Sequence, residues 1–362
     1  MSGVDRLHEC LARAIAEVRP ADPVSIARAR ERLDRLTKPR GSLGRLEDIA
    51  ARVCGIQATM RPRAAKRLVI VCAGDHGVAA EGVSAYPSDV TRQMVANFVA
   101  GGSAINALAR AAGADVWVID VAVAGPIPGR GDAARLVSRR IREGTGNFLR
   151  EPAMSEEEML EAIAIGCEEA ARAASEGVDV LGIGEMGIGN STAASTVTSA
   201  LTGVPARQVT GRGTGVDEAT FSRKVDVVER ALAIHRLRAD RPLHVLQTVG
   251  GLEIAALCGV CIGAAARRLI VITDGFIATS AALVAVTLCP LVAQYLFAAH
   301  LSSEPGHAVQ LDRLGERPLL QLDMRLGEGT GAALAMNLVG AACAAFNEMA
   351  TFESAGVSEG PC

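Results

Sequence analysis

Aromatic side chains are scarce in this chain: one Trp, two Tyr and seven Phe make up only 3% of its 362 residues. Hydrophobic residues nevertheless reach 49%, so a sizeable core must be packed mainly from Ala, Val, Leu and Ile. Acidic and basic residues nearly balance, with a net charge of −3. Because this charge gives no bulk attraction to nucleic acid or to an anionic membrane, we expect neither as a partner.

Signals for secretion, membrane insertion and metal binding are also weak. The first eight residues lack the charged-then-apolar order of a secretory signal, and the nine cysteines are scattered, as reduced thiols are. We therefore expect a cytoplasmic protein. The pair Cys258 and Cys261 lacks the further ligands of a zinc site, which favours buried core thiols. The apolar run 281–299 contains Pro290, which favours two buried helices over a membrane span.

Glycine is the residue in excess, at 38 of 362, and it gathers in loops that follow short apolar runs. Four such runs predict buried strands, at 67–72, 116–120, 178–182 and 269–273. Ala-rich segments with a helical pattern, such as 103–112 and 156–174, separate them. This alternation predicts an α/β fold in which a mostly parallel sheet is flanked by helices in a Rossmann-like manner.

An acidic residue ends or closely follows each predicted strand. These residues are Asp75, Asp120, Glu185 and Asp274. Ligands of open parallel sheets bind beyond the carboxyl ends of the strands. We therefore expect a ligand site at that edge, with the four carboxylates gathered around it.

The two ends of the chain differ from its middle. Residues 1–60 are polar and helical in pattern, and 331–352 is helical and Ala-rich. We expect residues 1–62 and 332–362 to pack together as a small helical domain, while 63–331 forms the large α/β catalytic domain.

Two glycine-rich segments are candidates for phosphate binding. The first, 182–187, matches G-x-G-x-x-G, but no acidic residue follows about 20 positions on, where a dinucleotide site needs one. A backbone cradle for one phosphate and ribose fits this segment better. The second, 210–217, contains Arg212. Together with Lys224 it could neutralise a phosphate, although both cations could equally be solvated.

Glu328 is the strongest candidate for a catalytic carboxylate. It lies between Gly327 and Gly329, directly before the helix-forming run 332–336. Glycine lets a ligand approach the backbone closely, and a helix N-terminus favours anionic groups. A shielded carboxylate in this place has the setting of a general base. On these residues alone, a solvated Glu in a surface turn is an equal alternative.

Seven segments, taken in order, carry a resemblance that spans nearly the whole chain. They are KPRGSLGRLE at 38–47, AGDHGV at 73–78, GEMGIGN at 184–190, KVDVV at 224–228, VGGLE at 249–253, DGF at 274–276 and RLGEGTG at 325–331. In these segments the chain resembles the nicotinate-nucleotide–dimethylbenzimidazole phosphoribosyltransferases, which assemble the lower ligand of cobalamin. The combination is far more specific than any one segment.

The resemblance implies a large α/β domain with a small helical domain, in a homodimer. It implies transfer of phosphoribose from nicotinate mononucleotide to 5,6-dimethylbenzimidazole, which gives nicotinate and α-ribazole 5′-phosphate. No cofactor and no metal are expected. Glu328 occupies the position of the family's catalytic base, and we expect Glu185 to act as a supporting carboxylate.

The resemblance also implies which residues contact the substrates. Tyr86, Met94 and Met186 are expected to form a flat, mostly apolar slot for the acceptor base. Further contacts are expected at Gly184, Gly187, Asn190, Lys224, Asp274, Gly327 and Gly329.

Two other functions are alternatives to this enzyme activity. A nucleotide-binding regulatory or scaffold protein would keep the fold without turnover. The sequence of such a protein would lack Glu328 or the glycines around it. Both are present. An NAD-dependent dehydrogenase is disfavoured by the incomplete G-x-G-x-x-G pattern.

Overall fold

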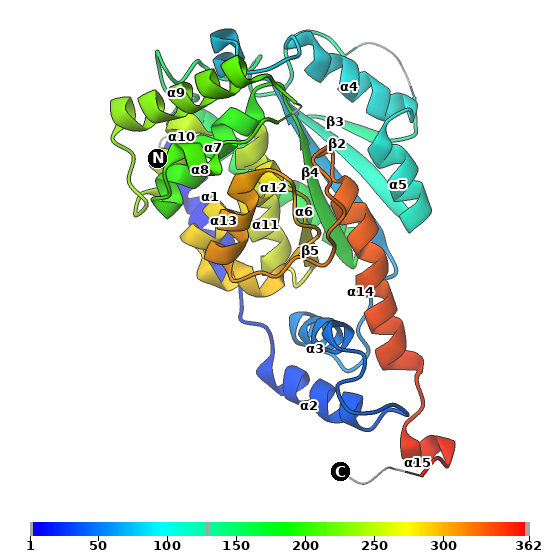
Figure 1. Ribbon diagram of the computed structural model, residues 1–362. Helices are drawn as coiled ribbons and strands as arrows, with labels where there is room; N and C mark the ends of the chain where they lie inside the picture. The colour runs from blue at the N-terminus through cyan, green and yellow to red at the C-terminus, as the bar shows by residue number, and fades with distance from the viewer. Residues whose placement is uncertain (1–2, 128–130, 214, 359–362) are drawn as a thin grey trace.

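One parallel sheet organises the fold. The computed structural model describes residues 3–127, 131–213 and 215–358, and within them six strands are present. They are β1 (Arg67–Gly74), β2 (Ala114–Ala122), β3 (Arg135–Ser138), β4 (Val180–Met186), β5 (Ile270–Thr273) and β6 (Leu296–Ala298). Their order is β3-β2-β1-β4-β5-β6, and every pairing is parallel (Figure 1). This order confirms the predicted α/β class, and its reversal between β1 and β4 opens a crevice at the carboxyl edge.

The four strands predicted from apolar runs are present, with different bounds. β1 and β2 extend beyond the predicted runs, and β4 continues to Met186 rather than ending at 182. Most of the glycine-rich segment 182–187 is therefore strand and not loop. The apolar pattern misses β3, which is largely exposed, and β6, which has only three residues.

Helices cover both faces of the sheet. One face carries α11 (Leu252–Ala266), with α6 (Glu156–Ser175) and α1 (Gly3–Glu17) packed against it. The other carries α4 (Asp89–Ala100), α5 (Ala104–Ala112) and α14 (Thr330–Glu348). Backbones approach closely where side chains are small: a Cβ on Gly166 of α6 would lie 1.9 Å from the Ala256 carbonyl oxygen of α11. Such contacts explain how a core with few aromatic residues is filled.

Helix α11 also contains the two cysteines that the sequence spaces as a pair. Cys258 and Cys261 are free and fully buried, as predicted for core thiols. Burial raises the pKa of both thiols, and that of Cys261 reaches about 12.

A cluster of helices surrounds α7 (Asn190–Thr202), which follows β4. Its neighbours are α8 (Ala206–Val209), α9 (Glu218–His235), α10 (Pro242–Val249), α12 (Phe276–Leu288) and α13 (Pro305–Leu314). The short 3₁₀ helix η1 (Gly77–Glu81) follows β1. Because η1 and α7 follow β1 and β4, they begin at the carboxyl ends of these strands and border the crevice.

A smaller helical unit extends away from the sheet (Figure 1). It contains α2 (Pro23–Asp34), α3 (Arg45–Gln57), α15 (Phe352–Ala355) and the far end of α14. An antiparallel bridge between Leu36 and Thr351 joins the two chain ends. The predicted domain division stays a prediction; the packing of α1 on α6 would assign residues 3–17 to the large unit. Residues 359–362 of the predicted small domain lie outside the described part.

The apolar run 281–299 breaks at Pro290, as predicted, but only its first part is α-helical. Helix α12 ends at Leu288, and a 3₁₀ helix, η2 (Pro290–Tyr295), leads into β6. The predicted second helix is therefore only this short 3₁₀ helix, because residues 296–298 pair with β5 instead. Among the described helices, only α14 is long and apolar enough to cross a membrane, and 56% of its apolar stretch is buried in the protein.

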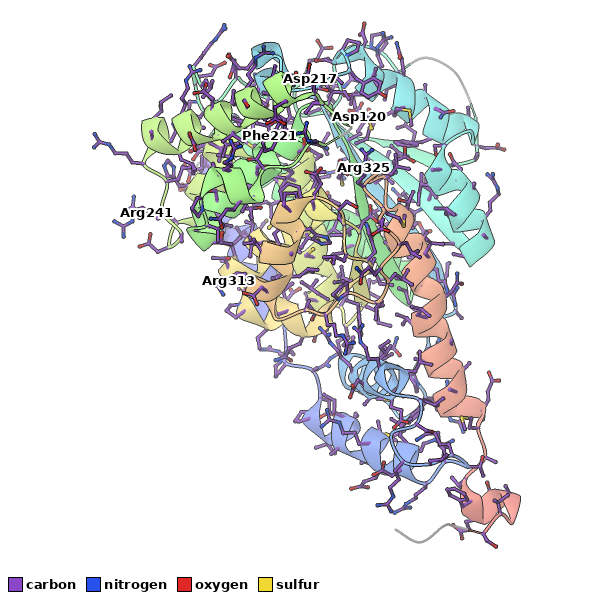
Figure 2. All side chains as sticks on the ribbon, viewed as in Figure 1. Asp120, Asp217, Phe221, Arg241, Arg313 and Arg325 are labelled. Carbon is purple, nitrogen blue, oxygen red and sulfur yellow. The ribbon has the colours of Figure 1, made fainter. Side chains whose placement is uncertain are left out.

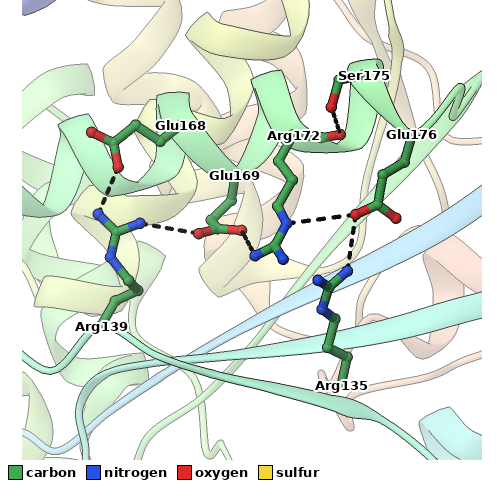
Figure 3. A network of polar contacts seen from close by, with 7 residues as sticks. All are labelled: Arg135, Arg139, Glu168, Glu169, Arg172, Ser175 and Glu176. Carbon is green, nitrogen blue, oxygen red and sulfur yellow. Dashed lines mark hydrogen bonds and ion pairs between the residues drawn. The ribbon is translucent and has the colours of Figure 1, made fainter.

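Charged side chains fasten the edge strand β3 to α6 (Figure 3). Beyond the end of β3, the Nη2 atom of Arg139 lies 2.6 Å from Glu168 Oε2, and its Nη1 atom lies 3.1 Å from Glu169 Oε1. Glu169 Oε2 also lies 3.7 Å from Arg172 Nη1. Glu169 is only 2% exposed, whereas the Glu168 side chain is 61% exposed. The buried carboxylate therefore depends on its two arginines, because an unpaired buried charge is costly.

We expect Glu169→Gln to lower the free energy of unfolding by about 1–3 kcal/mol, since it leaves two guanidinium groups without their shared partner. The matched control is Glu168→Gln, which removes the exposed partner of the same Arg139 and should cost no more than about 0.5 kcal/mol. Urea unfolding followed by circular dichroism measures both. Equal losses in the two variants would contradict the importance of the buried pair.

Candidate active site

A cavity of about 600 Å³ opens at the carboxyl edge of the sheet, within the usual size range of ligand sites. Figure 2 shows Asp120 and Arg325 near this edge. Eight of the residues predicted from the sequence line the cavity: Tyr86, Met94, Glu185, Met186, Gly187, Asn190, Lys224 and Glu328. Four others are absent from its described lining: Gly184, Asp274, Gly327 and Gly329.

Glu328 has a left-handed backbone conformation, with a φ of 64°, directly before α14. Its Oε2 accepts a hydrogen bond from the N–H of Ile105, in the first turn of α5, at 3.2 Å. No donor among the described residues binds Oε1, and the side chain lines the cavity. Burial raises the pKa of this carboxyl, and the Ile105 N–H opposes that rise. One oxygen is therefore anchored, and the other is free to accept a proton from a ligand.

Asp274 follows β5 and is only 1% exposed. Its Oδ1 accepts hydrogen bonds from the N–H groups of Gly331 at 2.7 Å and Ala332 at 3.1 Å, and its Oδ2 accepts one from Gly329 at 3.0 Å. Burial raises the pKa of this carboxyl to about 7 against these three bonds. Asp274 thus satisfies N–H groups that have no acceptor within α14. These bonds position the segment that carries Glu328; the predicted substrate contact of Asp274 stays a prediction.

Glu185 lies at the carboxyl end of β4 and is 6% exposed. Its Oε2 accepts a hydrogen bond from Asn190 Nδ2. Burial and then the nearby Asp274 raise the pKa of Glu185 to about 8, with smaller contributions from Glu253 and Glu328. At neutral pH the carboxyl is therefore mostly protonated, so it can donate as well as accept a hydrogen bond.

The cavity also contains groups suited to a phosphate. Lys224 on α9 is 1% exposed, and its Nζ donates to Ser191 Oγ at 3.1 Å. Ser191 belongs to the first turn of α7, and Gly189, at the N-cap of that helix, provides no side-chain cap in the described structure. Residues 187–191 line the cavity, so the N-terminus of α7 borders it, as helix N-termini do in many anion sites. In its first turn, the N–H groups of Asn190 and Thr192 donate to the carbonyl oxygens of Gly187 and Gly189. Arg212 lines the cavity too, although it pairs with Glu218.

Residues 18–357 match the protein family described as phosphoribosyltransferase. The chain belongs to this family. A nicotinate-nucleotide–dimethylbenzimidazole phosphoribosyltransferase from Chloroflexus aggregans is 54% identical over 349 residues, which are 96% of this chain and 98% of the relative. The protein of that name from Geotalea uraniireducens is 51% identical over 353 residues, or 97% and 99% of the two chains. The crystal structure of CobT from Thermus thermophilus has a TM-score of 0.88 at 49% identity, covering 93% of this chain and 100% of that one.

In this phosphoribosyltransferase, the glycines of β4 bring α14 close to the sheet. A Cβ on Gly184 would lie 2.3 Å from the backbone nitrogen of Gly329, and one on Gly182 would lie 3.0 Å from Ala332 Cβ. A Cβ on Gly327 would lie 2.4 Å from Glu185 Oε1. Gly184, Gly327 and Gly329 make room for α14 and for Glu185, and their predicted ligand contacts stay predictions. The G-x-G-x-x-G match does not mark a dinucleotide cradle here.

The apolar part of the phosphoribosyltransferase cavity contains the predicted acceptor residues. Tyr86 is 51% exposed, while Met94 and Met186 are half-buried and packed against the core. Four further lining residues, Ile188, Gly189, Arg325 and Leu326, belong to segments that carry the resemblance. The remaining lining residues are not individually predicted contacts: Val83, Ser84, Val90, Ser191, Gly213, Val216, Ile277 and Glu304. Of these, Val90 carries a usable signal, because its spacing of four from Met94 puts both on one face of α4.

Other polar residues at the strand ends of this phosphoribosyltransferase do not line the cavity. Asp75 Oδ2 accepts a hydrogen bond from the Ala124 N–H at 2.8 Å, and Asp120 Oδ2 lies 2.8 Å from Arg140 Nη2. His76 lies 2.7 Å from Glu253 in a fully buried pair. The predicted gathering of four carboxylates is wrong for Asp75 and Asp120, because each is bound by the segment after a neighbouring strand: Asp75 by Ala124 after β2, and Asp120 by Arg140 after β3.

The raised pKa of Glu185 predicts a pH-dependent effect on stability. Because its pKa rises from 4.5 to about 8 on folding, the folded state binds this proton more tightly, and stability falls as pH rises through that range. Glu185→Gln removes this loss. Its melting temperature should match that of the wild type at about pH 5 and exceed it at about pH 8.5. A difference that stays the same at both pH values would contradict the buried, protonated state of Glu185.

Proposed function

We propose that this protein transfers phosphoribose from nicotinate mononucleotide to 5,6-dimethylbenzimidazole. The products are nicotinate and α-ribazole 5′-phosphate, for the lower ligand of cobalamin. The observation that carries the proposal is Glu328, a shielded carboxylate with one anchored oxygen and one free oxygen in the cavity. Relatives that match nearly the whole chain bear the name of this enzyme.

Glu328 supplies what the acceptor chemistry requires. One ring nitrogen of the benzimidazole attacks C1′ of the ribose, while the other nitrogen carries a proton that must leave. The free Oε1 of Glu328 takes that proton, and the Ile105 N–H holds the other oxygen so that the carboxylate does not rotate away. The raised pKa of Glu328 matches this role, because a stronger base accepts the proton more readily.

The remaining residues position the donor nucleotide. Lys224, Ser191 and the start of α7 would hold its phosphate, while Glu185 and Asn190 would bind near the ribose. Nicotinate leaves readily, since its ring nitrogen is cationic in the nucleotide and becomes neutral on departure. Attack from the face opposite nicotinate inverts C1′ and converts a β-nucleotide into an α-product.

The direct test incubates the purified protein with nicotinate mononucleotide and dimethylbenzimidazole. Chromatography should detect free nicotinate and the α-ribotide in equal amounts. Binding of the nucleotide without products would favour the regulatory or scaffold alternative. Hydride transfer to or from a nicotinamide dinucleotide would favour the dehydrogenase, which the packing role of Gly182 and Gly184 disfavours.

Glu328→Gln should lower kcat by about 10²–10⁴, because glutamine keeps the volume and the acceptor for Ile105 but cannot take a proton. The variant should also lose the acidic limb of the pH–rate profile. Glu348→Gln is the matched control, since Glu348 is exposed at the far end of α14, the helix that Glu328 precedes. Turnover of Glu328→Gln within about threefold of wild type would contradict the assignment of the base.

The apolar slot predicts a broad choice of acceptor. Methionines adapt to ligands of different shape, and one methyl group gives only about 1–3 kcal/mol of discrimination in such a pocket. Benzimidazole and 5-methylbenzimidazole should therefore be used within roughly 200-fold of the dimethyl compound. Competition assays with mixed bases measure this for the wild type and for Met94→Gln. An unchanged order of preference in the variant would remove Met94 from the slot.

The resemblance that identified these residues also implies a homodimer in the cytoplasm, and we include both in the proposal. Analytical ultracentrifugation of the wild type should give about twice the protomer mass of 37.4 kDa. A single species at the protomer mass would count against the dimer.

A further inference from the structure

Glu304 lines the cavity but belongs to none of the segments that pointed to the function. It lies at the N-cap of α13 and is 6% exposed. Its Oε1 accepts a hydrogen bond from the Gly213 N–H at 2.7 Å. Its Oε2 is buried without a hydrogen-bond partner, and a Cβ on Gly211 would lie 2.1 Å from it. A buried carboxylate with one unpartnered oxygen must be compensated by a nearby charge.

Lys224 is the cation in reach of that charge. Gly213 lies between Glu304 and Lys224. Its N–H donates to Glu304, and a Cβ on it would lie 3.3 Å from both Lys224 Nζ and Ser191 Oγ. Burial lowers the pKa of Lys224, and the negative charge of Glu304 acts against that effect. Without Glu304, the lysine would lose its proton at a lower pH.

We propose that Glu304 is a positioning residue for the nucleotide: it fixes the segment 211–213 over Lys224 and serves as the counter-ion of the Lys224 ammonium. This inference rests on the proposed function, since it assigns Lys224 to the phosphate of the donor. Its consequence is that the protein holds a charged lysine at the phosphate end of the cavity even before the nucleotide arrives.

The other charged groups around the cavity do not replace Glu304 in this role. Arg212 is paired with Glu218, and Arg325 donates to the Gly213 carbonyl oxygen at 3.0 Å. Both are cations and would disfavour a second positive charge. Glu185 and Glu328 line the same cavity, but among the described residues the negative charge that raises the pKa of Lys224 is that of Glu304.

The test measures the affinity of nicotinate mononucleotide by titration calorimetry, without acceptor, from about pH 7 to pH 10. In the wild type, affinity falls tenfold per pH unit above the pKa of Lys224. In Glu304→Gln this fall should begin roughly one pH unit lower, because the counter-charge is gone. Glutamine keeps the acceptor for the Gly213 N–H, and thermal unfolding checks that the variant is folded.

Two further variants complete the test. Gly211→Ala keeps the carboxylate but pushes a methyl group against its Oε2, so the fall should again begin at lower pH. Asp226→Asn removes an exposed carboxylate from the same helix as Lys224 and should leave the profile unchanged. If the profile of Glu304→Gln is unshifted while the wild type is active, the role of Glu304 is overturned and the proposed function is unaffected. A wild type that binds no nucleotide overturns this inference together with the proposed function.

Discussion

The three hydrogen bonds between Asp274 and the start of α14 hold the active site together. Asp274 belongs to the end of β5, so these bonds fix the N-terminus of a long helix to the edge of the sheet. Glu328 directly precedes that helix in a strained, left-handed conformation. The glycines of β4 make the contact possible, since any side chain at Gly184 would collide with Gly329. The position of the proposed base therefore depends on an aspartate that need not touch a substrate.

This arrangement stabilises the site at the expense of the fold. Glu185, Asp274 and Glu328 are buried close together, and each has a raised pKa. A carboxyl that is protonated or strongly basic near neutral pH is useful for proton transfer, but burying its charge lowers the stability of the native state. Fixed N–H donors offset part of this cost. Function here is thus obtained from groups that a sequence selected only for stability would avoid.

The place of Glu328 directly before a helix could be predicted from the sequence, whereas the backbone groups that Asp274 binds could not, for one physical reason. Glycines around Glu328 and a helix-forming run after it are local signals, whereas the partners of Asp274 lie more than fifty residues away along the chain. Buried strands such as β1 are visible as apolar runs, but β3 and β6 are not, because an edge strand needs neither length nor continuous hydrophobicity. Glu304 has no local signal at all. Its environment is formed by the segment 211–213 and by Lys224, and only the fold brings these together.

Three of the helix N-termini at this edge of the sheet differ in what satisfies them. The start of α5 is bound by Glu328, and the start of α14 is bound by Asp274. The N-cap residue of α7 is Gly189, so that helix has no side-chain cap in the described structure. Since all three attract anions, two protein carboxylates occupy the first two and leave the third for an anionic ligand. The buried cation Lys224 lies beside that third helix, so the cavity has one place suited to a phosphate and another filled by the proposed base.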